Sequence, residues 1–139
     1  ALARERAEQV GALADDEEVA ITSQLRTWIP ANLGERYFAE LAFVDGLPAG
    51  IAVLVVNEYP ANPRFPNGRV GTVLNVWTRP AHRRRGLATA LLGEVIALGR
   101  QLGLARLELL SSEAGKPLYA SLGFVPSSDD HLPMELTYR

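Results

Sequence analysis

Three consecutive arginines, Arg83 to Arg85, stand directly before the most regular helical pattern of the sequence. A helix N-terminus carries unsatisfied N–H groups and a partial positive charge, so cations there are unfavourable. A bound polyanion resolves this conflict, because the N–H groups, the helix dipole and the guanidinium groups then favour the same ligand. Gly86 lets the backbone approach an anion closely, and the small Ala88 leaves room beside it. The pattern predicts a phosphate or pyrophosphate site, and a solvated arginine run is the alternative.

The elements on either side of the arginines form a strand–helix–strand unit. Residues Arg69 to Thr78 are rich in β-branched side chains and predict a strand that runs into a turn at Arg79-Pro80-Ala81. A helix begins at Gly86, and Gly103 fits its end. Its apolar side chains recur at helical spacing at Leu87, Leu91, Val95, Leu98 and Leu102. A second strand follows at Ala105 to Leu110, so the unit is a crossover between parallel strands.

The first half of the sequence predicts helices followed by a hairpin. Apolar spacing indicates two helices on either side of the acidic pair Asp15-Asp16. Strands are expected at Tyr37 to Val44 and Gly50 to Val56, joined by a turn at Asp45 to Pro48. The segment from Tyr59 to Gly68 contains three prolines and predicts a loop.

The end of the chain predicts a short helix around Lys116 to Leu122, a turn at Gly123-Phe124 and a last strand near Leu132 to Tyr138. The chain has 139 residues, a length that fits one domain. It has no cysteine, which excludes disulfides and thiolate chemistry. Its net charge of −2 argues against a nucleic-acid or anionic-membrane partner. No transmembrane or signal-like segment is visible, and we expect a cytoplasmic protein.

Two motifs carry a family resemblance. Arg83-x-x-Gly86-x-Ala88, placed after a strand, resembles motif A of the GNAT acetyltransferases. Tyr119, followed after three residues by Gly123-Phe124, is similar to motif B of the same family. Met134-Glu135-Leu136 resembles the closing strand of many members.

The resemblance implies an α/β (α+β) fold with a mixed central sheet flanked by helices, the acyl-CoA N-acyltransferase fold, as a single domain over residues 1–139. The chain begins at Ala1 without a methionine, and the first strand of that fold is expected among residues that precede it. The implied function is transfer of the acetyl group of acetyl-CoA to a primary amine of a small molecule or peptide. A non-catalytic acyl-CoA-binding regulatory domain is the alternative, and a homodimer is left open.

The resemblance also implies a set of site residues. In the family, backbone amides at the loop and helix start hold the pyrophosphate of coenzyme A, and here these belong to Arg84 to Thr89. The cofactor-binding residues implied are Val76, Trp77, Thr78, Arg83, Arg84, Arg85, Gly86, Leu87, Ala88, Thr89 and Ser112. Ser112 stands where relatives often carry an asparagine that contacts the cofactor, and a cap of the next helix is an equal alternative. No metal is implied.

Tyr119 is the implied general acid, which gives a proton to the departing thiolate. Its alternative role is that of a core aromatic beside Leu118. A bulge near Asn75-Val76 is expected to present a backbone N–H to the carbonyl. The central strand has no glutamate where many relatives carry the general base, so Glu58 is the nearest candidate, with a solvent-facing role or water-mediated deprotonation as alternatives.

Overall fold

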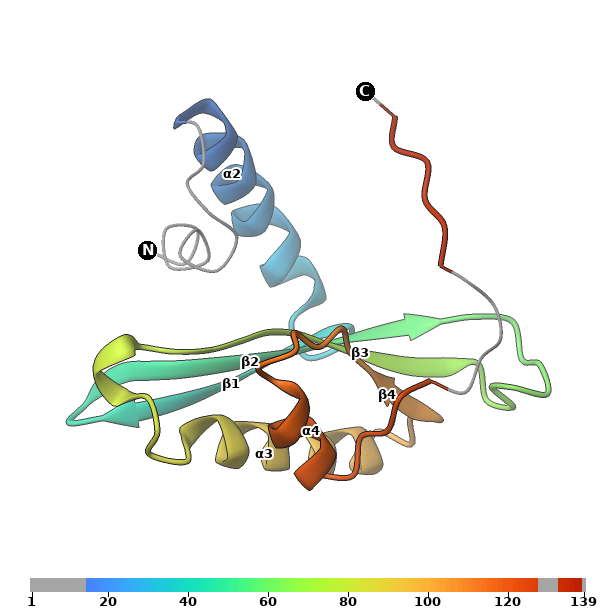
Figure 1. Ribbon diagram of the computed structural model, residues 1–139. Helices are drawn as coiled ribbons and strands as arrows, with labels where there is room; N and C mark the ends of the chain where they lie inside the picture. Colours follow the sequence, from blue (N-terminus) through green and yellow to red (C-terminus); the bar gives the residue numbers. More distant parts are fainter. Residues whose placement is uncertain (1–14, 128–132, 139) are drawn as a thin grey trace.

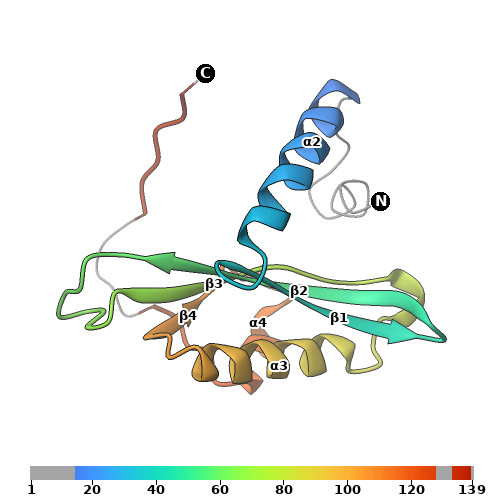
Figure 2. The same cartoon turned by 180° about the vertical axis from the view of Figure 1, so that it is seen from behind.

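A computed structural model describes residues 15–127 and 133–138, and it has one sheet of four strands in the order β1-β2-β3-β4. Figures 1 and 2 show α3 and α4 on one face of this sheet and α2 rising from the opposite face. The elements in chain order are α2 (Asp15–Asn32), β1 (Tyr37–Val44), β2 (Leu47–Glu58), β3 (Arg69–Thr78), the 3-10 helix η1 (Pro80–His82), α3 (Leu87–Gln101), β4 (Arg106–Glu108) and α4 (Lys116–Ser121).

The strands β1 and β2 form the predicted antiparallel hairpin. Asp45 has φ 52° and Gly46 has φ 79°, which is the backbone that a tight two-residue hairpin turn requires. The turn is therefore shorter than predicted, because Leu47 and Pro48 already belong to β2. The glycine matters here because left-handed backbone is costly for most side chains.

The crossover unit is confirmed, and it supplies four of the six residues of the main buried cluster. β3 runs antiparallel to β2 and parallel to β4, with α3 between β3 and β4 in the chain. The buried face of α3 packs against the sheet. Together they form a cluster of buried apolar side chains, which consists of Ala52, Leu54, Val73, Leu91, Leu92 and Val95. Each large apolar side chain buried in this way contributes roughly 1.5–3 kcal/mol, so α3 is held firmly on the sheet.

The ends of the crossover elements agree with the sequence except at β4. β3 has the predicted bounds, and α3 starts after Gly86 and is followed by Gly103 with φ 70°. β4 covers only Arg106–Glu108, which is shorter than the predicted strand, because its pairing with β3 extends over three residues.

The loop from Tyr59 to Gly68 is confirmed, and hydrogen bonds fix both its base and its position. The amide of Tyr59 donates to the carbonyl of Gly68 at 2.7 Å. Asn67 Nδ2 donates to the carbonyl of Gly103 at 2.6 Å, and Arg69 Nη1 donates to that of Leu102 at 2.7 Å. The loop is therefore anchored at the C-terminal end of α3.

The acidic pair predicted to separate two helices is instead the first turn of α2, where carboxylates favour the positive end of the helix dipole. The helix predicted before Asp15 lies outside the described residues. α2 has no buried residue, and Trp28 makes an edge contact with Tyr37 at a ring-centroid distance of 5.6 Å. Among the described residues, no helix is both long enough and apolar enough to cross a bilayer.

The last predicted strand is wrong over residues 133–138, which have no regular secondary structure, while Leu132 lies outside the described residues. Met134, Leu136 and Tyr138 alternate as in a strand, but their exposed fractions are 93%, 78% and 88%. A strand needs a partner for its backbone hydrogen bonds, and this segment runs away from the sheet (Figure 1).

Candidate functional site

A β-bulge interrupts the pairing of β2 and β3. Ile51 pairs with Trp77, and Val53 pairs with Leu74. Ala52, the one β2 residue between these two pairs, therefore faces two residues of β3, Asn75 and Val76. Asn75 has φ 53°, a left-handed conformation that costs about 1–2 kcal/mol for most residues but less for asparagine. The bulge lies where the family resemblance implies it, and bulges re-aim the backbone of a strand next to a site.

The edge of β3 on the β4 side is only partly paired. The register joins Val70, Gly71 and Thr72 of β3 to β4 and ends there. Residues 73–78 of β3 therefore continue beyond the end of β4. A strand edge of this kind can pair with an extended ligand through backbone hydrogen bonds.

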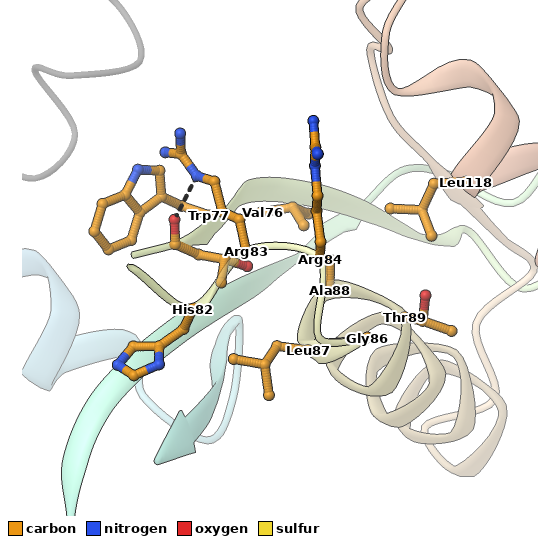
Figure 3. Close-up of a pocket in the computed structure, with 11 residues that line it drawn as sticks. Val76, Trp77, His82, Arg83, Arg84, Gly86, Leu87, Ala88, Thr89 and Leu118 are labelled. Atoms are coloured by element: carbon orange, nitrogen blue, oxygen red, sulfur yellow. Dashed lines mark hydrogen bonds between the residues drawn. The ribbon is translucent and has the colours of Figure 1, made fainter. Parts of the chain in front are cut away.

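A cavity of about 460 Å³ lies beside the bulge, between the end of β3 and the start of α3 (Figure 3). Its lining comes from β3, η1, α3 and α4 and consists of Val76, Trp77, Thr78, His82, Arg83, Arg84, Gly86, Leu87, Ala88, Thr89 and Leu118. The volume lies within the usual range for small-molecule sites.

The start of α3 offers backbone donors without internal partners. Gly86 has φ 75° and makes no side-chain cap, and the first turn contains no acidic residue. The first helical hydrogen bond runs from the amide of Ala90 to the carbonyl of Gly86 at 3.0 Å. The amides that precede Ala90 in the helix therefore point out of the helix end, where an anion is favoured.

The three arginines make different contacts. Arg83 Nε donates to the carbonyl of Thr78 at 3.0 Å, the bond drawn in Figure 3. Arg85 does not line the cavity, and its Nη1 lies 3.5 Å from Nδ1 of His82. Arg84 has φ 65°, and its side chain extends from the helix start with no hydrogen bond or ion pair to any described residue. Of the two arginines that line the cavity, Arg84 is thus the one whose whole guanidinium is available to a ligand.

Trp77 lines the cavity and is 8% exposed. Its Nε1 is closed to solvent and has no hydrogen-bond partner among the described residues, which costs about 1–3 kcal/mol. The free helix amides and Arg84 are the donors that face the cavity, and they fit a phosphate-containing ligand.

Tyr119 lies next to the cavity rather than in its lining, to which its neighbour Leu118 contributes. The Tyr119 ring makes an edge contact with Phe124 at a centroid distance of 6.0 Å. Burial raises the pKa of the Tyr119 phenol from its usual value of 10.0. The phenol therefore keeps its proton at neutral pH, as a general acid must.

Ser112 does not line the cavity, and its hydroxyl oxygen accepts a hydrogen bond from the amide of Gly115 at 3.1 Å. This bond closes the turn before α4, but the N-cap position of α4 is Gly115 and has no side-chain cap, so Ser112 does not cap the helix. His82 and Leu118 line the cavity but were not in the predicted set. Leu118 could have been found from its place beside Tyr119, and His82 from its place in the basic turn.

Glu58 is separated from the other predicted residues. It lies at the end of β2, where it pairs with Arg69, and it borders a second cavity. Ala52 lies opposite the bulge and is six residues before Glu58 on β2. The Glu58 backbone is therefore roughly 20 Å from the bulge along the strand. Among the described residues there is also no group of acidic, histidine or cysteine side chains that could hold a metal ion.

The sequence profile of the acetyltransferase (GNAT) family matches residues 5–124 of the chain. No curated protein matches this chain. A GCN5-related N-acetyltransferase from Ralstonia eutropha JMP134 is 29% identical, with a TM-score of 0.74 over 95% of this chain and 88% of that one.

Two further solved structures share the fold at lower identity. A predicted acetyltransferase with acetyl-CoA from Clostridium acetobutylicum has a TM-score of 0.79 and 22% identity, and the match covers 96% of this chain and 87% of the other. An aminoglycoside N-acetyltransferase in complex with CoA has a TM-score of 0.68 and 18% identity, with 96% and 86% covered. The mixed four-stranded sheet with its flanking helices is therefore the fold of these proteins.

Proposed function

Because the chain belongs to the acetyltransferase (GNAT) family, we propose that it transfers the acetyl group of acetyl-CoA to a primary amine by direct attack. The observation that carries the proposal is one continuous cavity that joins the β3 bulge to the positively charged start of α3. The bulge can present a backbone N–H to the carbonyl oxygen of a thioester. The start of α3 can bind the pyrophosphate of the same ligand.

The start of α3 binds the pyrophosphate in this proposal. The amides of Arg84 to Thr89 and the guanidinium of Arg84 supply the donors, and Arg83 braces the loop through its bond to Thr78. Along the pantetheine arm, backbone groups of β3 from Val76 to Thr78 provide the contacts that an added strand would make. This order of groups directs the acyl end of the ligand toward the bulge.

Bound acetyl-CoA supplies the acetyl group as a thioester. The amine nitrogen forms a C–N bond to the acetyl carbonyl carbon, and the C–S bond of the thioester breaks. A backbone N–H at the bulge stabilises the negative charge that develops on the carbonyl oxygen. Tyr119 gives its proton to the departing sulfur. The attacking amine loses a proton to water, because Glu58 lies too far from the bulge to accept it.

A panel of primary amines with acetyl-CoA, read by release of free thiol and by mass of the acetylated product, tests the proposal. We expect turnover with at least one amine. Binding of coenzyme A without acetylation of any amine would support a regulatory acyl-CoA-binding domain instead. Loss of both binding and turnover would reject the cavity as the cofactor site.

The Tyr119 phenol predicts a specific pH dependence. Burial raises its pKa from the usual 10.0, so most of the phenol is still protonated at pH 10. We expect kcat/KM to rise with pH as the amine loses its proton, and any decline that follows to have an apparent pKa above 10. Tyr119→Phe should lower kcat about 100-fold with little change in the KM for acetyl-CoA. A decline with an apparent pKa below 10, or full activity of Tyr119→Phe, would remove Tyr119 from the acid role.

A further inference from the structure

Asn75, at the bulge of β3, differs from the other four asparagines of the chain because its side chain is not engaged. Asn32, Asn57, Asn62 and Asn67 each donate a side-chain hydrogen bond within the protein. The side-chain amide of Asn75 makes no hydrogen bond to any described residue, although the residue is half-buried. Its donor and its acceptor are therefore both available to a ligand.

The backbone of Asn75 is strained at a place where no turn requires it. Within the described ranges, the non-glycine residues with positive φ are Asp45 at 52°, Asn75 at 53° and Arg84 at 65°. Asp45 belongs to the β1–β2 hairpin turn, which needs this conformation. Asn75 lies inside a strand, where glycine would adopt the same conformation at lower cost. Strain of this kind is typical of functional sites, and Arg84 is a second example at the same site.

The place of Asn75 along β3 separates it from the cofactor. The lining of the cavity beside α3 includes Val76, Trp77 and Thr78 but not Asn75 (Figure 3). In the proposed function the pantetheine arm follows these three residues, and the acetyl group lies at the bulge. Asn75 is therefore the first β3 residue beyond the acetyl end of the cofactor. The pairing of β4 with β3 ends at Thr72, so the strand edge at Asn75 is open to a second substrate.

A neutral amide suits an amine that must attack without a positive charge. The ammonium form has no lone pair, and a carboxylate beside it would stabilise that form. No ionisable side chain lies on β3 after Arg69. The Oδ1 atom of Asn75 can accept a hydrogen bond from an amine N–H, which holds the nitrogen beside the acetyl carbonyl carbon.

We propose that the side chain of Asn75 binds the primary amine of the acceptor and positions its nitrogen for attack on the acetyl group. The residue then has two roles, because its backbone forms the bulge and its side chain contacts the nucleophile. Glycine would fill the first role at lower cost, and only the second role requires the amide. This assignment rests on the proposed acetyl transfer.

Asn75→Gly separates the two roles, because it permits the left-handed backbone and removes the side chain. We expect this variant to keep the urea midpoint of the wild-type protein. Its kcat/KM for each acetylated amine of the panel should fall about threefold to tenfold, the effect of one lost hydrogen bond, while the KM for acetyl-CoA stays unchanged. The matched control is Asp45→Gly, which makes the same backbone change in the hairpin turn and should leave both kinetic constants unchanged.

NMR of the wild-type protein gives a readout that is independent of turnover. We expect the side-chain NH2 signal of Asn75 to shift saturably when n-butylamine is added to the protein saturated with coenzyme A. That shift without acetylation of any amine would retain the contact and reject the proposed function. Wild-type kcat/KM in Asn75→Gly would retain the function and overturn the assignment. A signal that shifts with coenzyme A but not with n-butylamine would also overturn it, since the side chain would then contact the cofactor.

Discussion

At the residue scale, Arg84 differs from its neighbours because its guanidinium has no bond to the rest of the described protein. Arg83 is fixed to Thr78, and Arg85 lies outside the cavity beside His82. We expect Arg84→Ala to raise the KM for acetyl-CoA about 10- to 100-fold, because the substitution removes one or two charge-assisted hydrogen bonds to the cofactor. Steady-state kinetics at saturating amine measures this.

The matched comparison is Arg100→Ala, which removes the same charge at the other end of α3. That variant should leave the KM for acetyl-CoA unchanged. Equal effects at both positions would mean that net charge rather than a local contact controls cofactor affinity.

Gly115 is a second residue with a defined consequence, because it leaves space for the proposed acid. A Cβ at this position would lie 3.0 Å from Cε2 of Tyr119 and 3.3 Å from Oγ of Ser112. We expect Gly115→Ala to displace the Tyr119 ring and to lower kcat about 10- to 100-fold, since small misplacements have large effects on catalysis.

A double-mutant cycle separates this positioning effect from general destabilisation. In the Tyr119→Phe background, Gly115→Ala should lower kcat little further, because the proton donor is already absent. Additive losses would show that the glycine acts independently of the phenol. The melting temperature of each variant serves as the folding control.

At the element scale, two glycines of the crossover unit predict opposite changes in stability. A Cβ at Gly71 on β3 would lie 2.7 Å from side-chain atoms of both Leu54 and Leu107. At Gly93 in α3 a Cβ would meet nothing within 4 Å. We expect Gly71→Ala to lower the free energy of unfolding by about 1–3 kcal/mol through overpacking. Gly93→Ala should raise it by about 0.5–1 kcal/mol through helix propensity.

Urea unfolding of the two variants beside the wild-type protein measures both changes. Tolerance of Gly71→Ala without loss of stability would mean that β4 is less tightly packed on β3 than the contacts with Leu54 and Leu107 indicate. A destabilising Gly93→Ala would contradict the exposed position of that helix face.

Local signals explain which elements the sequence predicts well. β3 and α3 were predicted almost residue by residue, because β-branched content and the leucine spacing lie within each segment. The bulge at Asn75 followed from the family resemblance, since no side-chain pattern marks it. The last strand failed because alternation at Met134 and Leu136 supplies propensity but no pairing partner, and pairing depends on distant parts of the chain.

The candidate site divides in the same way. Motif positions around Gly86 predicted most of the cavity lining, because a helix start and its preceding loop are local structures. The separation of Glu58 from the bulge depends on strand register, which the sequence does not display. The same register brings Asn57 to Thr72 and so creates a cavity that no motif indicates.

At the scale of the whole molecule, stability is concentrated in the sheet and α3. α2 has no buried residue, although it is longer than α3, which buries Leu91, Leu92 and Val95. We expect amides of α2 to exchange with solvent at least about 100-fold faster than those of α3, since a helix that buries no residue opens at low free energy. Hydrogen exchange read residue by residue measures this difference, and equal protection would mean that α2 is held by contacts beyond those described.

The cavity lining joins the continuous stretch from the end of β3 to the start of α3 with Leu118 of α4, so its shape depends on the folded arrangement of α4 and α3. A ligand that binds there only in the folded state adds its binding free energy to that of folding, about 2.7 kcal/mol at a free concentration 100 times its Kd. That gain is a sizeable part of the stability of an ordinary domain. The supply of coenzyme A would then set how long each copy of the protein survives proteolysis, as well as how fast it works.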